Sequence, residues 1–310
     1  MALKNIQEIK TKSLHWIDIN DPGKKEIEYL QENFNFHELD VKACPPPNQR
    51  PRVFAHQDYI FMILQFPVYN RATREIEASE IDFFITPDML ITVHESRLLP
   101  ISILFNNCQN NKKFQTSKMI GNPAILLYEI LNELFLSCFP MLNHINLDID
   151  EIDNKMFARN EEQMVEEISV IKLNIINFRK IMQLHKTIIK KLIEKAPQFF
   201  STAKLNIYFH NLISHTKEIW DNLENYKDTI NALHETNESL ISFKTNEIIK
   251  TLTIFSVIVL PMTLMASIFG MNTLDGMPFL EGNYGFEIIL GLMLVVALTM
   301  AVFFKKKKWL

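Results

Sequence analysis

One long stretch of this sequence lacks positive charge. From residue 251 to residue 304 there is no lysine, arginine or histidine. The acids of that stretch are Asp275, Glu281 and Glu287. Residues 1–250 are rich in charge, so the ordinary overall composition hides a sharp division. A stretch of this kind argues against a uniformly water-soluble chain and indicates membrane-spanning segments.

Other features are scarce as well. Cys44, Cys108 and Cys138 lie far apart without a CxxC pair, which argues against a zinc ribbon or a disulfide framework. We therefore expect a reducing, cytosolic environment for residues 1–250. The net charge of −4 argues against a nucleic-acid-binding protein. The first ten residues have no apolar segment, so we expect no cleavable signal peptide.

Two apolar runs predict two transmembrane helices, at residues 251–271 and 288–304, joined by an extracytoplasmic loop at residues 272–287. The first run is long enough to cross a hydrocarbon core of roughly 30 Å, and the second is near the short end of the range. Buried helices of a soluble protein are the alternative. The loop has no lysine or arginine, whereas lysines flank both runs on the other side: Lys244, Lys250, Lys305, Lys306, Lys307 and Lys308. We expect a multi-pass protein of the cell (inner or plasma) membrane with both termini in the cytoplasm.

Residues 1–120 are predicted to form a cytoplasmic α/β domain. Segments rich in Ile, Phe and Val are strand candidates at 14–19, 59–66, 80–86 and 89–94. Residues 24–34 are predicted to be helical after the turn Asp21-Pro22-Gly23, and Pro87-Asp88 predicts a tight hairpin.

No glycine occurs between Gly121 and Gly270, which predicts long helices. We expect a helical pair within residues 121–199, from helices at about 123–157 and 160–195. A stalk helix at 200–250 would continue into the first span, ending at 271. A seven-residue spacing along this stalk predicts packing against other helices, of the same chain or of other subunits. Its members are Leu205, Leu212, Ile219, Tyr226, Leu233 and Leu240, with a second row at Phe209, Leu223 and Ile230. A continuous rod is a means of carrying a cytoplasmic movement to the membrane.

Two spans cannot enclose a water-filled path, so a pore requires several subunits. The first span is the better candidate for lining it, because it holds several hydroxyl side chains on one helix face. The face comprises Asn246, Ile249, Thr253, Ser256, Leu260, Thr263, Ser267 and Gly270. Ile249, Leu252 and Leu260 could form apolar rings that gate by dewetting. Alternatively, the hydroxyls bond to carbonyls of their own helix or to a neighbouring helix.

The outer end of this span carries Gly270, Met271 and Asn272, followed by the acids Asp275 and Glu281. A ring of Asn272 side chains would offer neutral oxygens to a cation, and the acids would concentrate cations at the mouth. Mg²⁺ releases its waters reluctantly, so such a ring suits a hydrated ion.

At these residues the sequence resembles the CorA family of divalent-cation channels, whose signature is Gly-Met-Asn at the outer end of the first of two C-terminal spans. The resemblance extends over most of the chain. It includes Trp16-Ile17-Asp18, Gln49-Arg50-Pro51-Arg52, residues 90–95, residues 246–250, Met277-Pro278 and the ending at 305–310.

The resemblance implies a funnel-shaped homopentamer that passes Mg²⁺, often with Co²⁺ and Ni²⁺ accepted, down the electrochemical gradient. It implies a selectivity filter at Gly270, Met271 and Asn272, with hydrated Mg²⁺ held by Asn272, and Lys305–Lys308 as a cytoplasmic basic collar. The implied pore-lining residues are Asn246, Ile249, Leu252, Thr253, Ser256, Leu260, Thr263 and Ser267.

The sequence departs from the family pattern at three places. Phe269 stands where Tyr is usual, and Glu281 must replace an acid that usually follows Met-Pro directly. Asn211 stands where some members carry a regulatory Asp, so a regulatory Mg²⁺ site there would be weak.

Two alternatives remain open. The first is a Zn²⁺ transporter of the same superfamily, which usually carries Ile or Val at the position of Met271. The second is a membrane-anchored coiled-coil sensor or scaffold that passes no ion. The sequence contains no phosphate-cradling glycine loop, nucleophile elbow or paired metal-binding histidines, so we predict that the protein is not an enzyme.

Overall fold

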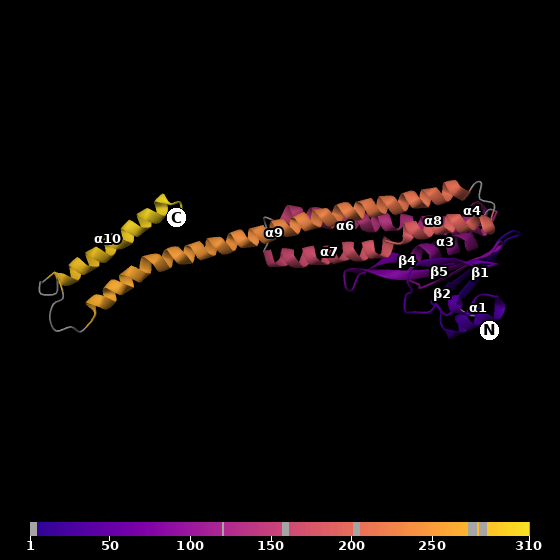
Figure 1. The fold of residues 1–310 in the computed structure, drawn as a ribbon, viewed down its shortest axis with the longest axis horizontal. Coiled ribbons are helices and arrows are strands. Elements are labelled where there is room, and N and C mark those ends of the chain that lie inside the picture. Colours follow the sequence, from indigo (N-terminus) through magenta and orange to yellow (C-terminus); the bar gives the residue numbers. More distant parts are fainter. Residues whose placement is uncertain are drawn as a thin grey trace. The chain divides into compact units, whose positions relative to one another are not determined.

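The computed structural model describes residues 5–119, 121–156, 161–200, 205–271, 278 and 284–309. The chain divides into two compact units, Met1–His234 and Glu235–Leu310. Each unit is described by itself below, and the helix α9 (Leu205–Phe269) contributes to both (Figure 1).

A six-stranded sheet forms the centre of the first unit. Its strands are β1 (Ile6–Lys10), β2 (His15–Asn20), β3 (Arg52–Ala55), β4 (Ile60–Asn70), β5 (Glu75–Ile85) and β6 (Met89–His94). Their order is β1-β2-β6-β5-β4-β3. The pair β2–β6 is parallel, and the other neighbours are antiparallel. The central strands are apolar on both faces, which requires helices on both sides of the sheet.

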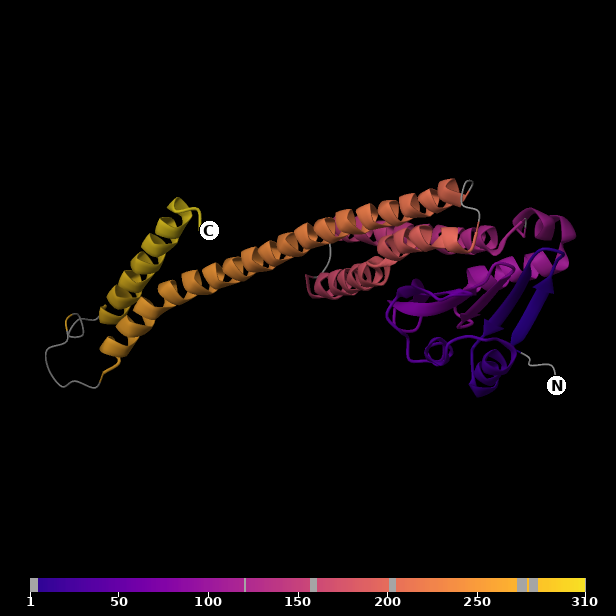
Figure 2. The same cartoon turned by 45° about the vertical axis from the view of Figure 1, so that its right-hand side comes forward.

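The helices meet this requirement (Figure 2). On one face, α1 (Lys24–Asn33) and α2 (Glu38–Val41) cover a core that includes Ile17, Phe61 and Phe84. The other face is covered by later helices, including α3 (Leu99–Asn110) and α5 (Pro123–Leu136). The short α4 (Lys112–Lys118) lies against α3 and α5.

The predicted α/β fold is confirmed, with changes in detail. The four predicted strands and the helix after Gly23 are present, and the hairpin at Pro87-Asp88 closes where predicted, with the Thr86 backbone N–H donating to the Met89 carbonyl at 2.9 Å. The edge strands β1 and β3 and the helices α2, α3 and α4 were not predicted. Edge strands are short and half exposed, so their apolar pattern is weak.

Two predicted helices are each divided in two. The segment 123–157 forms α5 and α6 (Cys138–Lys155), and 160–195 forms α7 (Glu161–Met182) and α8 (His185–Lys195), followed by the short helix η1 (Ala196–Gln198). Pro140 explains the first break, because it has no N–H to donate to the carbonyl of Leu136. No proline or glycine marks the second break. There His185 is buried edge-on against the rings of Phe66 and Phe135, at 4.9 and 5.6 Å.

The seven-residue row on the first part of α9 is buried within the chain itself. Leu205, Leu212, Ile219 and Leu233 are buried, as are Phe209, Leu223 and Ile230 of the second row. Helices α5 and α7 supply contacts. The ring of Tyr208 lies 4.8 Å from that of Tyr128, and Arg179 lies 5.1 Å from the Trp220 ring and 2.5 Å from Glu224. The partners that the spacing left open are therefore helices of the same chain.

A side chain of α7 also fastens the hairpin between β4 and β5. The Oδ1 atom of Asn174 accepts from the Ile76 backbone N–H at 2.8 Å, and its Nδ2 donates to the Arg74 carbonyl at 2.9 Å. Because Asn174 is buried, these bonds replace lost contacts with water and fix the hairpin against the helix.

Among the residues that the structure describes, three helical segments are long and apolar enough to cross a membrane: Pro123–Lys155, α9 and α10 (Gly285–Lys306). In the first, 44% of the apolar window is buried within the chain, compared with 6% in α9 and 0% in α10. The first segment is therefore part of the core of its unit. The other two expose their apolar side chains, as the two predicted spans require.

Candidate ion-conducting face

Within the second unit, one face of α9 is covered. Ile254 is buried, and Ile258, Pro261, Met262, Met265 and Phe269 are half-buried. At 100° per residue these six side chains fall within an arc of about 100°, and the half-buried Val259 lies about 60° outside it. The other described helix of this unit is α10, whose Phe304 is also buried. We refer to these six residues of α9 as the covered face.

The predicted pore-lining residues lie on the opposite side of α9, centred about 180° from the covered face. All eight are exposed in the single chain: Asn246, Ile249, Leu252, Thr253, Ser256, Leu260, Thr263 and Ser267. We refer to them as the pore face. The three large apolar members, Ile249, Leu252 and Leu260, are 54%, 64% and 71% exposed. Exposure also extends to flanking apolar residues such as Phe255, so hydroxyl content rather than exposure distinguishes the pore face.

Three of the four hydroxyl groups of the pore face donate to their own helix. Thr253 Oγ1 donates to the Ile249 carbonyl at 2.7 Å, Ser256 Oγ to Leu252 at 2.8 Å, and Thr263 Oγ1 to Val259 at 3.0 Å. This is the bonding that the sequence left open as an alternative to pore lining. The two functions are compatible, because a hydroxyl that has donated its hydrogen still has lone pairs to accept with.

Helix α9 ends at the predicted filter. The backbone N–H of Gly270 donates to the Ala266 carbonyl at 2.9 Å. A Cβ atom at Gly270 would lie 2.9 Å from that same oxygen, closer than side chains tolerate, so this position requires glycine. Met271 is exposed. The filter residue Asn272 and the predicted outer acids Asp275 and Glu281 lie outside the residues that the structure describes.

The predicted basic collar forms the end of α10. Lys305 and Lys306 are helical, Lys307 caps the helix, and all four lysines are exposed. The ring of Trp309 stacks on that of Phe304 at 5.9 Å, and its backbone N–H donates to the Phe304 carbonyl at 3.0 Å. An aromatic side chain beside lysines is typical of a helix end at a membrane interface.

The predicted regulatory position is occupied by a side-chain contact. The Tyr128 hydroxyl donates to Asn211 Oδ1 at 3.3 Å. Among the acids of the first unit, Asp88 and Asp221 are exposed, whereas Asp82 is buried inside the α/β domain. In the described part of the chain, no three His, Cys, Asp or Glu side chains are grouped so that they could hold a metal ion.

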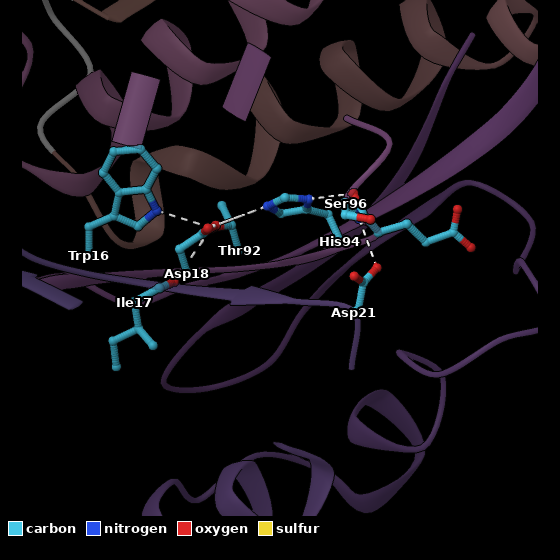
Figure 3. Close-up of polar contacts among 8 residues, drawn as sticks. Trp16, Ile17, Asp18, Asp21, Thr92, His94 and Ser96 are labelled. Carbon is cyan, nitrogen blue, oxygen red and sulfur yellow. Dashed lines mark hydrogen bonds and ion pairs between the residues drawn. The ribbon is translucent and has the colours of Figure 1, made fainter. Parts of the chain in front are cut away.

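A buried polar network in the α/β domain was not predicted (Figure 3). Asp18 Oδ1 accepts from the Thr92 hydroxyl at 2.5 Å and lies 3.2 Å from His94 Nε2. The Thr92 hydroxyl in turn accepts from Trp16 Nε1 at 3.0 Å. The sequence motifs around Trp16 and His94 indicated the family resemblance. Residue spacing could not predict that Asp18 and His94, which are 76 positions apart in the chain, are in contact.

An α/β domain, a set of helices and two exposed apolar helices, one with a hydroxyl-bearing face, define a membrane protein with a cytoplasm-type globular domain. Comparison with known families identifies it further. Residues 11–306 match the model of the CorA-like Mg²⁺ transporter protein family. The chain belongs to this family, which consists of transporters and channels, in agreement with the prediction that it is not an enzyme.

Similarity to individual proteins supports this family assignment. The chain is 28% identical to the cobalt/magnesium transport protein CorA of Thermotoga maritima, covering 95% of this chain and 83% of that one. It is 24% identical to the putative metal ion transporter YfjQ of Bacillus subtilis, over 95% and 89%. The complete structure of the CorA magnesium transporter from Methanocaldococcus jannaschii has the same fold, with a TM-score of 0.82, 23% identity, and coverage of 98% of this chain and 94% of that one.

Proposed function

We propose that the protein is a homopentameric channel that mediates influx of hydrated Mg²⁺, with the pore face of α9 around the axis. The observation that carries the proposal is the placement of the hydroxyl-bearing face. It lies opposite the covered face and is exposed in the single chain, so it is free to face the same surface of other subunits. The similarity to cobalt/magnesium transport proteins supports the choice of ion.

The hydroxyl hydrogen bonds support a hydrated rather than a bare ion. Thr253, Ser256 and Thr263 each donate inward to a carbonyl, so they present lone pairs outward. Water molecules bound to a cation point their hydrogens away from it. A ring of acceptors therefore stabilises the water shell of a cation and disfavours that of an anion. No charged side chain is needed for this discrimination.

The apolar members of the pore face suit a gate. Ile249, Leu252 and Leu260 project from the same side of α9 as the hydroxyls. Rings of such side chains close a narrow pore by excluding water. When the gate is open, the membrane potential drives the ion inward. A single charge gains about 2.3 kcal/mol per 100 mV, so a divalent ion gains about 4.6 kcal/mol.

A flux assay tests the function. The purified protein is reconstituted in liposomes, and uptake of Mg²⁺, Co²⁺, Ni²⁺ and Zn²⁺ is measured with and without a proton gradient. We expect potential-driven uptake of Mg²⁺, with Co²⁺ and Ni²⁺ also accepted and no need for the proton gradient. Uptake of Zn²⁺ alone would favour the zinc transporter, and absence of all uptake would favour a scaffold.

The pore face has a matched control on the other span. Thr263→Val keeps the shape of the side chain but removes the acceptor, and it should reduce Mg²⁺ uptake several-fold. Thr299 of α10 makes the same bond to its own helix, to Val295 at 2.7 Å. Thr299→Val should leave uptake unchanged. Equal effects of the two substitutions would contradict the assignment of α9 as the pore-lining helix.

Two further measurements test the filter and the assembly. Asn272→Ala should abolish Mg²⁺ uptake while leaving the oligomer intact, and normal uptake in this variant would refute the assignment of the filter. The native mass of the solubilised protein should be five times 36.3 kDa after subtraction of detergent. A dimer would overturn the pentameric architecture.

A further inference from the structure

Two carboxyl groups lie side by side in the core of the α/β domain, away from the pore face. Glu80 and Asp82 are two residues apart on β5, so they project from the same face of the sheet. Asp82 is 1% exposed and Glu80 is 6% exposed. Asp82 lies opposite Ile63 of β4 and Val93 of β6, which are apolar. A carboxylate in this position has lost its hydration.

The hydrogen bonds compensate for this loss only in part, although the side chain of Cys44 interacts with Asp82 and that of Gln65 with Glu80. Within the described residues, Asp82 Oδ1 is buried without a hydrogen-bond partner. Glu80 Oε2 accepts from the backbone N–H of Gln49. Both carboxyl groups line a cavity of about 10 Å³, close to the volume of one water-sized group. Other residues lining it include Cys44, Asn48, His94 and Glu95.

The charged and titratable groups around the pair come from every element that packs on it. Asp40 and Cys44 approach from α2 and the segment after it, Arg52 from β3, and His94 and Glu95 from the end of β6. Arg52 is the cation whose charge acts on both carboxyl groups, while His94, which also lines the cavity, is paired with Asp18. One cation can balance one carboxylate, so the second remains uncompensated when both are ionised.

We propose that Glu80 and Asp82 form a proton-binding site in the core of the α/β domain, which keeps one proton at neutral pH and releases it as the pH rises. Release would place two negative charges beside one cavity. Their repulsion and hydration would loosen the packing of the Asp40–Cys44 segment on the sheet. The site makes the stability of this domain depend on cytoplasmic pH.

The electrostatics agree with the geometry. Burial raises the pKa of Asp82 well above its usual range, and the charge of Glu80 raises it further. Burial raises the pKa of Glu80 to about 7, against the opposing bond from Gln49. Because these carboxyl groups have higher pKa values in the folded state than in the unfolded state, their stabilisation is complete below the ordinary carboxyl pKa. It is lost as the pH rises through the folded value.

The native cysteines provide the test. Cys44 is buried beside the pair, whereas the pKa of Cys138, which is also buried, is raised by burial alone, without an acid neighbour. The full-length protein in detergent is pulsed with N-ethylmaleimide at pH 6, 7 and 8, and mass spectrometry measures the labelling rate of each cysteine. The ratio of the two rates cancels the ionisation that is common to thiols. We expect the ratio of Cys44 to Cys138 to rise with pH, by up to about tenfold per pH unit for one released proton.

Variants make the result decisive. Asp82→Asn and Glu80→Gln each remove one carboxyl group with little change of shape. Both should reduce the rise of the labelling ratio with pH. Asp58→Asn removes an exposed acid from the same domain and should behave as the wild type. A constant ratio in the wild type, or an undiminished rise in both core variants, would overturn the proposal. Protection of Cys44 by Mg²⁺ at pH 8 that disappears in Asp82→Asn would also overturn it, by assigning the cavity to a metal ion.

Discussion

Replacing Asp18 by Asn should remove a pH dependence from the α/β domain. Both ring nitrogens of His94 face acceptors: Nδ1 lies 2.8 Å from the Glu95 carbonyl, and Nε2 lies 3.2 Å from Asp18 Oδ1 (Figure 3). Acceptors at both nitrogens favour the doubly protonated ring, the imidazolium, over the neutral one. Burial alone would lower the pKa of His94, but the hydrogen bond and charge of Asp18 outweigh it and raise the pKa.

The magnitude follows from burial. The side chains of His94 and Asp18 are 0% and 7% exposed, so water screens their interaction little. Because the pKa of His94 is raised by folding, its stabilisation is complete below the ordinary value near 6.5 and is lost as the pH rises through the folded value. The loss is up to about 1.4 kcal/mol per pH unit. Asp18→Ala would leave the imidazolium unpaired and cost about 3–5 kcal/mol.

Asp18→Asn keeps the shape of the side chain and changes its charge. The amide oxygen can still accept from Thr92, while the amide nitrogen can donate to Nε2 of a neutral His94. The expected loss of opening free energy is about 1–3 kcal/mol at pH 6. Above pH 6 the opening free energy of this variant should not change with pH. Hydrogen exchange measured by mass spectrometry in the full-length protein, corrected for chemical exchange, gives the opening free energies of β2 and β6 at pH 6 and pH 8.

The quantity to compare is the change of the opening free energy with pH. The control is Asp58→Asn, which removes an exposed acid. The wild type and the control should show weaker protection of β2 and β6 at pH 8 than at pH 6, and Asp18→Asn should not. Equal protection of the wild type at pH 6 and pH 8 would refute the claim that His94 is protonated in the folded state. The same slope in Asp18→Asn would show that other groups, such as Glu80 and Asp82, cause the whole effect.

Three further predictions concern the first unit. Asn174→Ala leaves the buried N–H of Ile76 without its acceptor, so protection of the β4–β5 hairpin in hydrogen exchange should fall by about 1–3 kcal/mol. Arg179→Lys replaces a planar group that lies over Trp220, so the melting temperature of the full-length protein should fall by an amount equivalent to about 1 kcal/mol. Burial lowers the pKa of His185 to about 4, so its stabilisation is lost as the pH falls from about 6.5 towards that value, and His185→Phe should reduce this loss in melts from pH 7 to pH 4.

The predictable part of the fold was the part with regular apolar spacing. The strands β4 and β6 are mostly apolar, and the row of α9 repeats every seven residues over the four repeats from Leu205 to Leu233. The break between α7 and α8 was not predictable, because the packing of His185 against Phe66 and Phe135 fixes it. Those aromatic partners are distant in sequence, and periodicity carries no information about them.

The candidate site shows the same limit. A face of α9 could be predicted from spacing, since residues three and four apart share a helix face. Spacing could not show that Thr253 and Thr263 donate to their own helix, which decides that they act as acceptors. The pair Glu80 and Asp82 gave no signal either. Alternating acids on a strand usually indicate an exposed face, and burial of this one follows from the covering segment at Cys44.

The two patterns on α9 are linked by a single row. Continued in steps of seven from Leu205, the row passes Leu240 and the exposed Glu247 and reaches Ile254 and Pro261 of the covered face. A straight helix turns such a row by about 20° per repeat, so the face that it marks rotates slowly along the helix. Over the three repeats from Leu240 to Pro261 the rotation is only about 60°. The row therefore reaches the covered face at Ile254 and Pro261, and the hydroxyl-bearing side of α9 lies opposite these two residues.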